Sequence, residues 1–210
     1  KEGVMVVREY ISKIAVKELI SKTHALSVAA MDAVDMLQGS LIYGNLLMLE
    51  DLKDSVSRIR ADVPVLVKAF TEESRDSAWA ESYRNVPGHL SMIGEHLEGM
   101  AQGLSRKVTG GILFSDKAVG EANFLFERIK DILQNTSDMI LARNDIVANY
   151  IASAEADIVR AANDFSTKHE ERLIEGICMP QASAVYINLL NAIKAVAWQA
   201  KEIARELRSK

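Results

Sequence analysis

The chain has 210 residues, of which 49% are hydrophobic and 26% charged, with a formal net charge of −4 and a pI near 5.7. The apolar fraction is too high for a disordered chain. The scattered, slightly acidic charge argues against nucleic-acid binding, which needs a basic face. No apolar run reaches the roughly 20 residues of a membrane-spanning helix, so we expect no integral membrane segment.

Apolar residues recur at helical spacing along nearly the whole sequence, and no segment alternates for long at a period of two. The first apolar stripe predicts a helix over 7–37, which is weakly interrupted at 39–40. A second helix is predicted over 46–70. Pro64 lies inside it and should kink or break it, because proline lacks the backbone N–H and clashes with the preceding turn.

A third helix is predicted over 79–108, with a further kink at Pro87. Residues 109–111 (Thr-Gly-Gly) form the clearest break in the sequence. Ser115 is suited to cap the N-terminus of a fourth helix over 116–144.

A fifth helix is predicted over 146–176, where Gly176 is suited to end it, and Pro180 is suited to begin a sixth helix that continues to about Leu207. The two tryptophans, Trp79 and Trp198, are interpreted as packing residues at the edge of the bundle.

Two polar doublets recur at an offset of 103 residues, from 83 to 186 and from 35 to 138. The matching residues are Tyr83 and Asn85 with Tyr186 and Asn188, and Asp35 and Met36 with Asp138 and Met139. The offset predicts a duplicated three-helix unit, with repeats over 1–109 and 112–210. The fold class is therefore all-α: six long helices in an elongated tandem pair of three-helix bundles stacked end to end, with long grooves and no enclosed pocket.

Sequence motifs for catalysis are absent. The Thr-Gly-Gly break lacks the Lys-Ser/Thr partner and the preceding strand of a phosphate-binding loop. No Glu-x-x-His pair exists for a di-iron bundle, and no motif of a zinc hydrolase is present. Cys178 has no nucleophile signature around it and is interpreted as a buried or loop cysteine. We therefore predict no enzyme activity, no catalytic residue and no cofactor.

One stretch of the third helix leaves two interpretations open. Ser91 and Glu95 lie one helical turn apart, and His96 follows directly. These residues form part of a metal site or simply a solvated helix face. Glu50, Asp51 and Asp54 form a similar acidic group on the second helix.

Several segments in both halves match a known pattern. The second half contains His-Glu-Glu-Arg-Leu at 169–173, Glu-Gly-Ile-Cys at 175–178, then Pro180 and Tyr186, and residues 90–96 read Leu-Ser-Met-Ile-Gly-Glu-His. These segments resemble the PhoU family of phosphate-uptake regulators. The resemblance implies a duplicated three-helix fold and a non-catalytic regulator or accessory protein. Its implied partner is a membrane phosphate transporter or a sensor protein.

The same resemblance implies metal ligands, because the family has a Glu-x-x-x-Asp pair on each repeat that supplies carboxylates to iron or zinc clusters. Here the first pair reads Ser91 and Glu95, and the second reads Lys194 and Trp198. We expect the second site to be absent. The first is either absent as well or reduced to a residual iron or zinc site of Glu95 with Asp54 from the neighbouring helix.

The remaining expectations follow from the resemblance. They are a cytoplasmic location peripheral to the inner membrane and contact with the membrane only through a partner. A homo-oligomer is expected for a separate reason, because long amphipathic bundles often leave apolar stripes that self-associate. Two alternatives stay open: a metal-binding helical bundle, and a helical signalling or scaffold module unrelated to phosphate. Since the chain begins with Lys1 and not with methionine, a free protein and an excised domain are both consistent with it.

Overall fold

The computed structural model describes residues 2–75 and 77–208, and side chains from residue 13 onward within those ranges. The side chains of Val7 and Ile11, which begin the first predicted stripe, lie outside this part. The described chain contains helices and no strand, as the sequence predicts. The helices are α1 (Glu2–Tyr43), α2 (Leu46–Glu73), α3 (Ala78–Tyr83), α4 (Val86–Thr109), α5 (Asp116–Ala142), α6 (Asp145–Ile174) and α7 (Pro180–Glu206).

The prolines of the first half act differently from the prediction. Pro64 lies inside α2, which continues to Glu73. Of the two outcomes predicted for Pro64, a kink or a break, the break is wrong, because the buried residues Val63, Leu66 and Phe70 on either side of the proline hold the helix together. Near Pro87 the chain is fully interrupted, so that α3 and α4 are separate helices. Pro87 lies in the first turn of α4, where a missing N–H costs nothing.

The helix ends follow local sequence signals. The weak interruption predicted at 39–40 is absent. α1 ends at Tyr43 and is followed by Gly44, whose φ of 64° is a conformation that glycine adopts without strain. Ser115 caps α5 as predicted, since its hydroxyl accepts the backbone N–H of Ala118 at 3.3 Å. Gly176, with a φ of 74°, follows the end of α6, and Pro180 begins α7.

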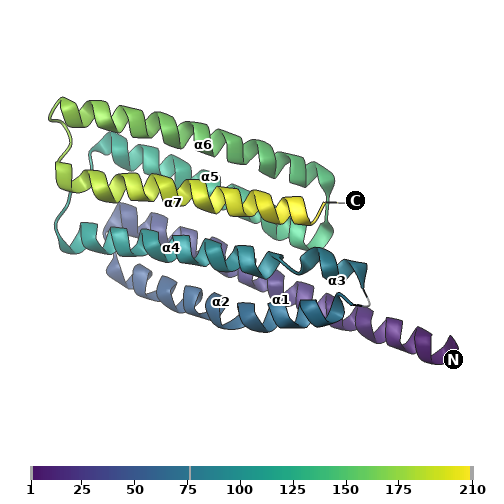
Figure 1. Cartoon of the computed structure of the whole chain (residues 1–210). Coiled ribbons are helices and arrows are strands. Elements are labelled where there is room, and N and C mark those ends of the chain that lie inside the picture. Colours follow the sequence, from purple (N-terminus) through teal and green to yellow (C-terminus); the bar gives the residue numbers. More distant parts are fainter. Residues whose placement is uncertain (1, 76, 209–210) are drawn as a thin grey trace.

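The six long helices form two groups of three that lie side by side, α1, α2 and α4 below α5, α6 and α7 in Figure 1. The closest packing between the groups joins α1 to α5 and α4 to α7. Ser27 and Ser137 link α1 to α5 through a buried hydrogen bond of 2.9 Å. The expected end-to-end stacking was therefore wrong. The connections α1–α2, α4–α5 and α6–α7 all lie at one end of the molecule (Figure 1).

The width of the buried face of α1 explains this arrangement. Ile20, Ser27, Ala33, Leu37 and Ser40 are all buried. At about 100° per residue these positions spread over about 160° of the helix surface, which is wider than the roughly 100° stripe of an ordinary amphipathic helix. As a result α1 packs against α2, α4 and α5 at once. By length and composition its segment 13–43 is also apolar enough to cross a bilayer, contrary to our expectation. Core helices of soluble bundles have this composition too.

The helix bounds are consistent with the proposed repeats over 1–109 and 112–210. Shifted by 103 residues, α2 would cover 149–176, close to the observed α6 at Asp145–Ile174. The same shift brings α3 and α4 onto α7. The duplication thus remains a proposal that the element order supports.

Candidate functional site

A buried ionic cluster joins the three helices of the second half. The guanidinium of Arg172 on α6 donates two hydrogen bonds to the carboxylate of Glu121 on α5, at 2.8 and 2.7 Å. The hydroxyl of Tyr186 on α7 donates to the same carboxylate at 2.6 Å. The side chains of Arg172 and Glu121 are only 9% and 13% exposed. One carboxylate therefore binds a cation and a phenol away from bulk solvent.

The protonation states of the cluster follow from these bonds. Burial alone would raise the pKa of Glu121, but the hydrogen bonds from Arg172 and Tyr186 outweigh it and the pKa is lowered. The hydrogen bond to Glu121 raises the pKa of Arg172. Burial, and then the bond to Glu121, raises the pKa of Tyr186. Glu121 is therefore charged at neutral pH, and Tyr186 keeps the proton that it donates.

A second layer of side chains packs on Tyr186. Its ring lies 4.7 Å from the ring of His169 and 5.6 Å, edge to face, from the ring of Phe114. His169 Nε2 is 2.8 Å from Ser183 Oγ, which fixes the imidazole between α6 and α7. The other ring nitrogen, Nδ1, is buried and has no hydrogen-bond partner. A buried nitrogen without a hydrogen-bond partner costs folding free energy, so this atom calls for an explanation.

This second layer forms the wall of a small pocket of about 220 Å³. The turn between α6 and α7 closes it: the carbonyl of Arg172 accepts the N–H groups of Ile177 and Cys178, at 2.9 and 3.2 Å. Cys178 is buried in this turn, as the sequence predicted for a loop cysteine. The pocket is lined by Leu113, Phe114, Ser115, Ala118, His169, Ile177, Cys178, Met179 and Ala182.

Sequence reasoning found half of this site. The segments 169–173 and 175–178 were singled out by their resemblance, but Glu121 was missed. A readable signal existed on α6, because His169 and Arg172 continue the buried stripe of Ile158 and Ala162. Polar residues at core-facing positions of a helix need buried partners. The identity of that partner on α5 could not be read from the sequence.

The residues of the predicted residual metal site lie on exposed helix surfaces. Asp54 is exposed on α2 and Glu95 is exposed on α4, while Ser91 is half-buried. Among the described residues, no group of three or more His, Cys, Asp or Glu side chains is placed to hold a metal. Two exposed carboxylates would leave most of the coordination to water, so this donor set fits a metal cluster poorly. The residual site remains a prediction.

The corresponding position on α7 offers no carboxylate. Lys194 Nζ lies 3.0 Å from Asn163 Oδ1, so an ammonium group bridges α7 to α6. One turn further along α7, Trp198 is 45% exposed. A cation and an indole at these places do not suit a bound metal ion.

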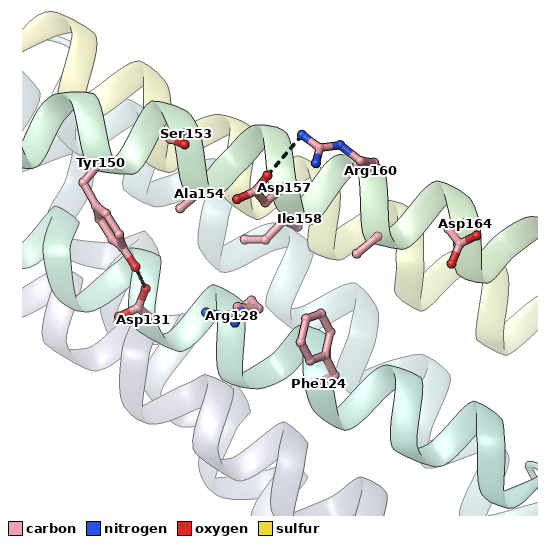
Figure 2. A pocket seen from close by; sticks show the side chains of 11 residues that line it. Phe124, Arg128, Asp131, Tyr150, Ser153, Ala154, Asp157, Ile158, Arg160 and Asp164 are labelled. Carbon is pink, nitrogen blue, oxygen red and sulfur yellow. Dashed lines mark hydrogen bonds and ion pairs between the residues drawn. The ribbon is translucent and has the colours of Figure 1, made fainter.

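A larger open groove of about 680 Å³ runs between α5 and α6 (Figure 2). Most of its polar side chains already have partners. Tyr150 donates to Asp131, and Arg160 pairs with Asp157 at 3.1 Å. The guanidinium of Arg128 lies 5.3 Å from the centre of the Phe124 ring. The exposed charges are partnered, and we find no arrangement for nucleophilic or acid–base catalysis here.

Both tryptophans, which the sequence suggests are packing residues at the edge of the bundle, are about half-exposed. Trp198 lines a depression of about 620 Å³, and Trp79, which is 53% exposed, lines another of about 590 Å³. The two depressions share Arg84, Asn85, Arg205 and Glu206. We call these four residues and the two indoles the tryptophan surface.

The tryptophan surface is held by contacts between helices. His89 Nδ1 on α4 lies 2.7 Å from Gln199 Oε1 on α7. Arg143, which follows α5, lies 5.7 Å above the ring of Trp79 and donates to the backbone carbonyl of Leu207 at 3.0 Å. The surface is therefore supported by elements of both halves.

These observations define an all-helical protein of two adjacent three-helix groups, with a buried ionic cluster in one of them. No known family model and no curated protein matches the sequence. Solved structures do match the fold. PhoU from Pseudomonas aeruginosa aligns with a TM-score of 0.83 and 12% identity, over 93% of this chain and 96% of that one.

A second similar structure is the phosphate transport system regulatory protein PhoU from Streptococcus pneumoniae, with a TM-score of 0.83 and 11% identity, over 93% of this chain and 94% of that one. The chain therefore has the PhoU fold, and the resemblance noted in the sequence is confirmed at the level of the fold. At these identities the likeness concerns architecture, and residue roles have to be argued from this chain.

Proposed function

We propose that this chain is a non-catalytic regulator or accessory protein of phosphate transport that acts by binding another protein. The observation that carries the proposal is the PhoU fold over 93% of the chain, since one of the similar structures is described as a regulatory protein of a phosphate transport system. The proposal includes a cytoplasmic location, peripheral to the inner membrane through a transporter or sensor protein, and self-association.

The tryptophan surface is the part of the molecule best suited to bind that partner. Tryptophan and arginine dominate the binding energy of protein interfaces, because they bury much surface per side chain. Here two half-exposed indoles flank Arg84 and Arg205 in adjoining depressions. Both guanidiniums are also paired, Arg84 with Glu81 and Arg205 with Glu202, so the surface presents little net charge. It suits a partner face that is apolar and close to neutral.

The experiment is affinity purification of the tagged chain from its own host cells grown with excess phosphate, followed by mass spectrometry. We expect a phosphate transporter or a phosphate-sensing protein to be recovered. Replacing Trp79 and Trp198 together with alanine should lower that recovery at least tenfold, because interface tryptophans commonly contribute about 2 kcal/mol or more each.

A matched control uses Phe124→Ala, since Phe124 is an aromatic residue of similar exposure in the α5–α6 groove. That variant should bind like the wild type. Unchanged recovery with both tryptophans replaced would disprove the role of the surface. Recovery of no phosphate-related protein, together with unaltered phosphate uptake after gene deletion, would disprove the function and favour an unrelated scaffold.

A further inference from the structure

We infer that the pocket beneath the α6–α7 turn is a binding site for a small, uncharged, mainly apolar molecule that carries one hydroxyl group. The site belongs to the second half alone and is distinct from the tryptophan surface. It does not depend on the proposed regulatory function.

The size and lining of the pocket set the apolar part of this ligand. Most of the lining side chains are hydrocarbon or aromatic, and Leu113, Ile177 and Met179 are also exposed, so they form a mouth open to solvent. An apolar protein cavity of about 150 Å³ is enough to hold a benzene ring. At about 220 Å³ this pocket therefore accepts one six-membered ring with a small substituent.

His169 determines the polar part of the ligand. The side chain lines the pocket, is 2% exposed, and has Nδ1 buried without a partner. Because Nε2 already pairs with Ser183, Nδ1 is a donor in one tautomer and an acceptor in the other. Nδ1 has almost no accessible surface, so a ligand reaches it only after a small shift of the imidazole. A hydroxyl group both donates and accepts, so it can then pair with Nδ1 in either case. Ser115, which also lines the pocket, offers a hydroxyl of the protein.

The charges around the pocket disfavour an anion, inorganic phosphate included. The nearest buried cation is Arg172, and its two terminal nitrogens are occupied by Glu121. Burial, and then the charge of Arg172, lowers the pKa of His169, so the imidazole is neutral at physiological pH. An anion entering here would lose its hydration. Two cationic groups lie near the walls, Arg172 Nε, which is buried without a partner, and Lys107 Nζ, 5.2 Å from the centre of the Phe114 ring, but neither residue lines the pocket.

The ionic cluster gives the pocket its fixed shape. Tyr186 is bound to Glu121 through its hydroxyl and touches two pocket walls, His169 and Phe114, with its ring. A buried ion pair brings little net stability over apolar packing. A preformed wall, in contrast, lowers the cost of ordering the site when a ligand binds.

The test uses phenol as the probe and the ¹⁵N- and methyl-labelled full chain, observed by NMR. Phenol should bind with a dissociation constant in the range of about 0.1 to 10 mM, as expected for so small a ligand. It should show nuclear Overhauser contacts to the methyl groups of Ala118 and Ala182. Benzene should bind about fivefold more weakly, since it forgoes one hydrogen bond.

Two variants fill the pocket from different walls, Ala182→Phe on α7 and Ala118→Leu on α5. Each should abolish the phenol shifts, whereas Ala184→Phe, at an exposed position of the same helix as Ala182, should leave them unchanged. Inorganic phosphate should shift none of these signals.

The contacts of phenol in the wild-type protein test the inference even if a pocket-filling variant fails to fold. Absence of phenol contacts to Ala118 and Ala182 would overturn the inference. Equal affinities for phenol and benzene would overturn the requirement for a hydroxyl group, and phosphate binding at these residues would overturn the class of ligand.

Discussion

Tyr83 and Tyr186 stand 103 residues apart, and both are fully buried. Tyr83 donates its hydroxyl proton to the backbone carbonyl of Ile140 at 2.7 Å, and its ring stacks on Phe70 at 5.8 Å. Tyr186 donates instead to the carboxylate of Glu121. Burial raises the pKa of Tyr83 to about 12. The pKa of Tyr186 is raised further, since its acceptor is charged.

The residues around the two tyrosines explain the difference. The positions 103 residues before Glu121 and His169 are Glu18 and Leu66. Glu18 pairs at the surface with Lys22 at 2.8 Å, and Leu66 is a buried core residue. The first half thus packs around its tyrosine without an internal ion pair. A three-helix unit of this fold can therefore form without an ionic cluster. This difference points to a role for the cluster in the adjacent pocket.

The largest expected effect comes from removing the carboxylate of the cluster. Glu121→Leu leaves Arg172 buried without its counter-charge, which should lower the free energy of unfolding by about 3 to 5 kcal/mol. Glu18→Leu, the corresponding change in the first half, should leave the urea midpoint unchanged, because its ion pair is exposed.

The double variant Glu121→Leu with Arg172→Met sharpens this test. Since both charges are removed, it should recover most of the lost stability in urea denaturation. A double variant as unstable as the single one would show that the cluster itself, and not an unpaired charge, holds the second half together.

A smaller effect is expected from the two tyrosine hydroxyls. Tyr186→Phe removes a hydrogen bond to a charged group and should cost about 1.5 to 3 kcal/mol, whereas Tyr83→Phe removes one to a neutral carbonyl and should cost about 0.5 to 1.5 kcal/mol. Urea unfolding of the two variants compares them directly. Equal losses of unfolding free energy would mean that the hydrogen bond of Tyr186 to a carboxylate is worth no more than that of Tyr83 to a carbonyl.

The smallest expected effect is on the pH dependence of folding stability. Burial, then the charge of Arg172, lowers the pKa of His169 below its ordinary value of 6.5, although Glu121 and Glu170 oppose this. The unfolded chain therefore takes up the proton at higher pH than the folded one. The stabilisation from a neutral His169 is complete above about pH 6.5 and is lost as the pH falls through the folded value.

His169→Gln should accordingly weaken the loss of stability between pH 7 and pH 5, as measured by thermal unfolding. The pKa of His96 is also lowered by burial, so His96→Gln is the matched control and should remove a separate part of the pH dependence. An unchanged pH profile in the His169 variant would contradict the assignment.

Much of the fold was predictable because helix formation follows local rules. The apolar stripes, the Ser115 cap, Gly176 and Pro180 each act within a few residues along the chain, and the structure has helices and ends where they indicate. The effect of Pro64 was not predictable in this way. Whether a proline interrupts a helix depends on how firmly its neighbours are buried against other helices.

The sequence by itself determined that this chain is all-helical, and it marked the segment from His169 to Cys178 as unusual. Only the tertiary structure decided that the helix triplets lie side by side, that Glu121 meets Arg172 across 51 residues of sequence, and that both tryptophans remain exposed. The physical reason is that hydrogen bonding within a helix is local. Burial and ion pairing depend on which faces of distant helices meet, and periodicity alone does not specify those partners.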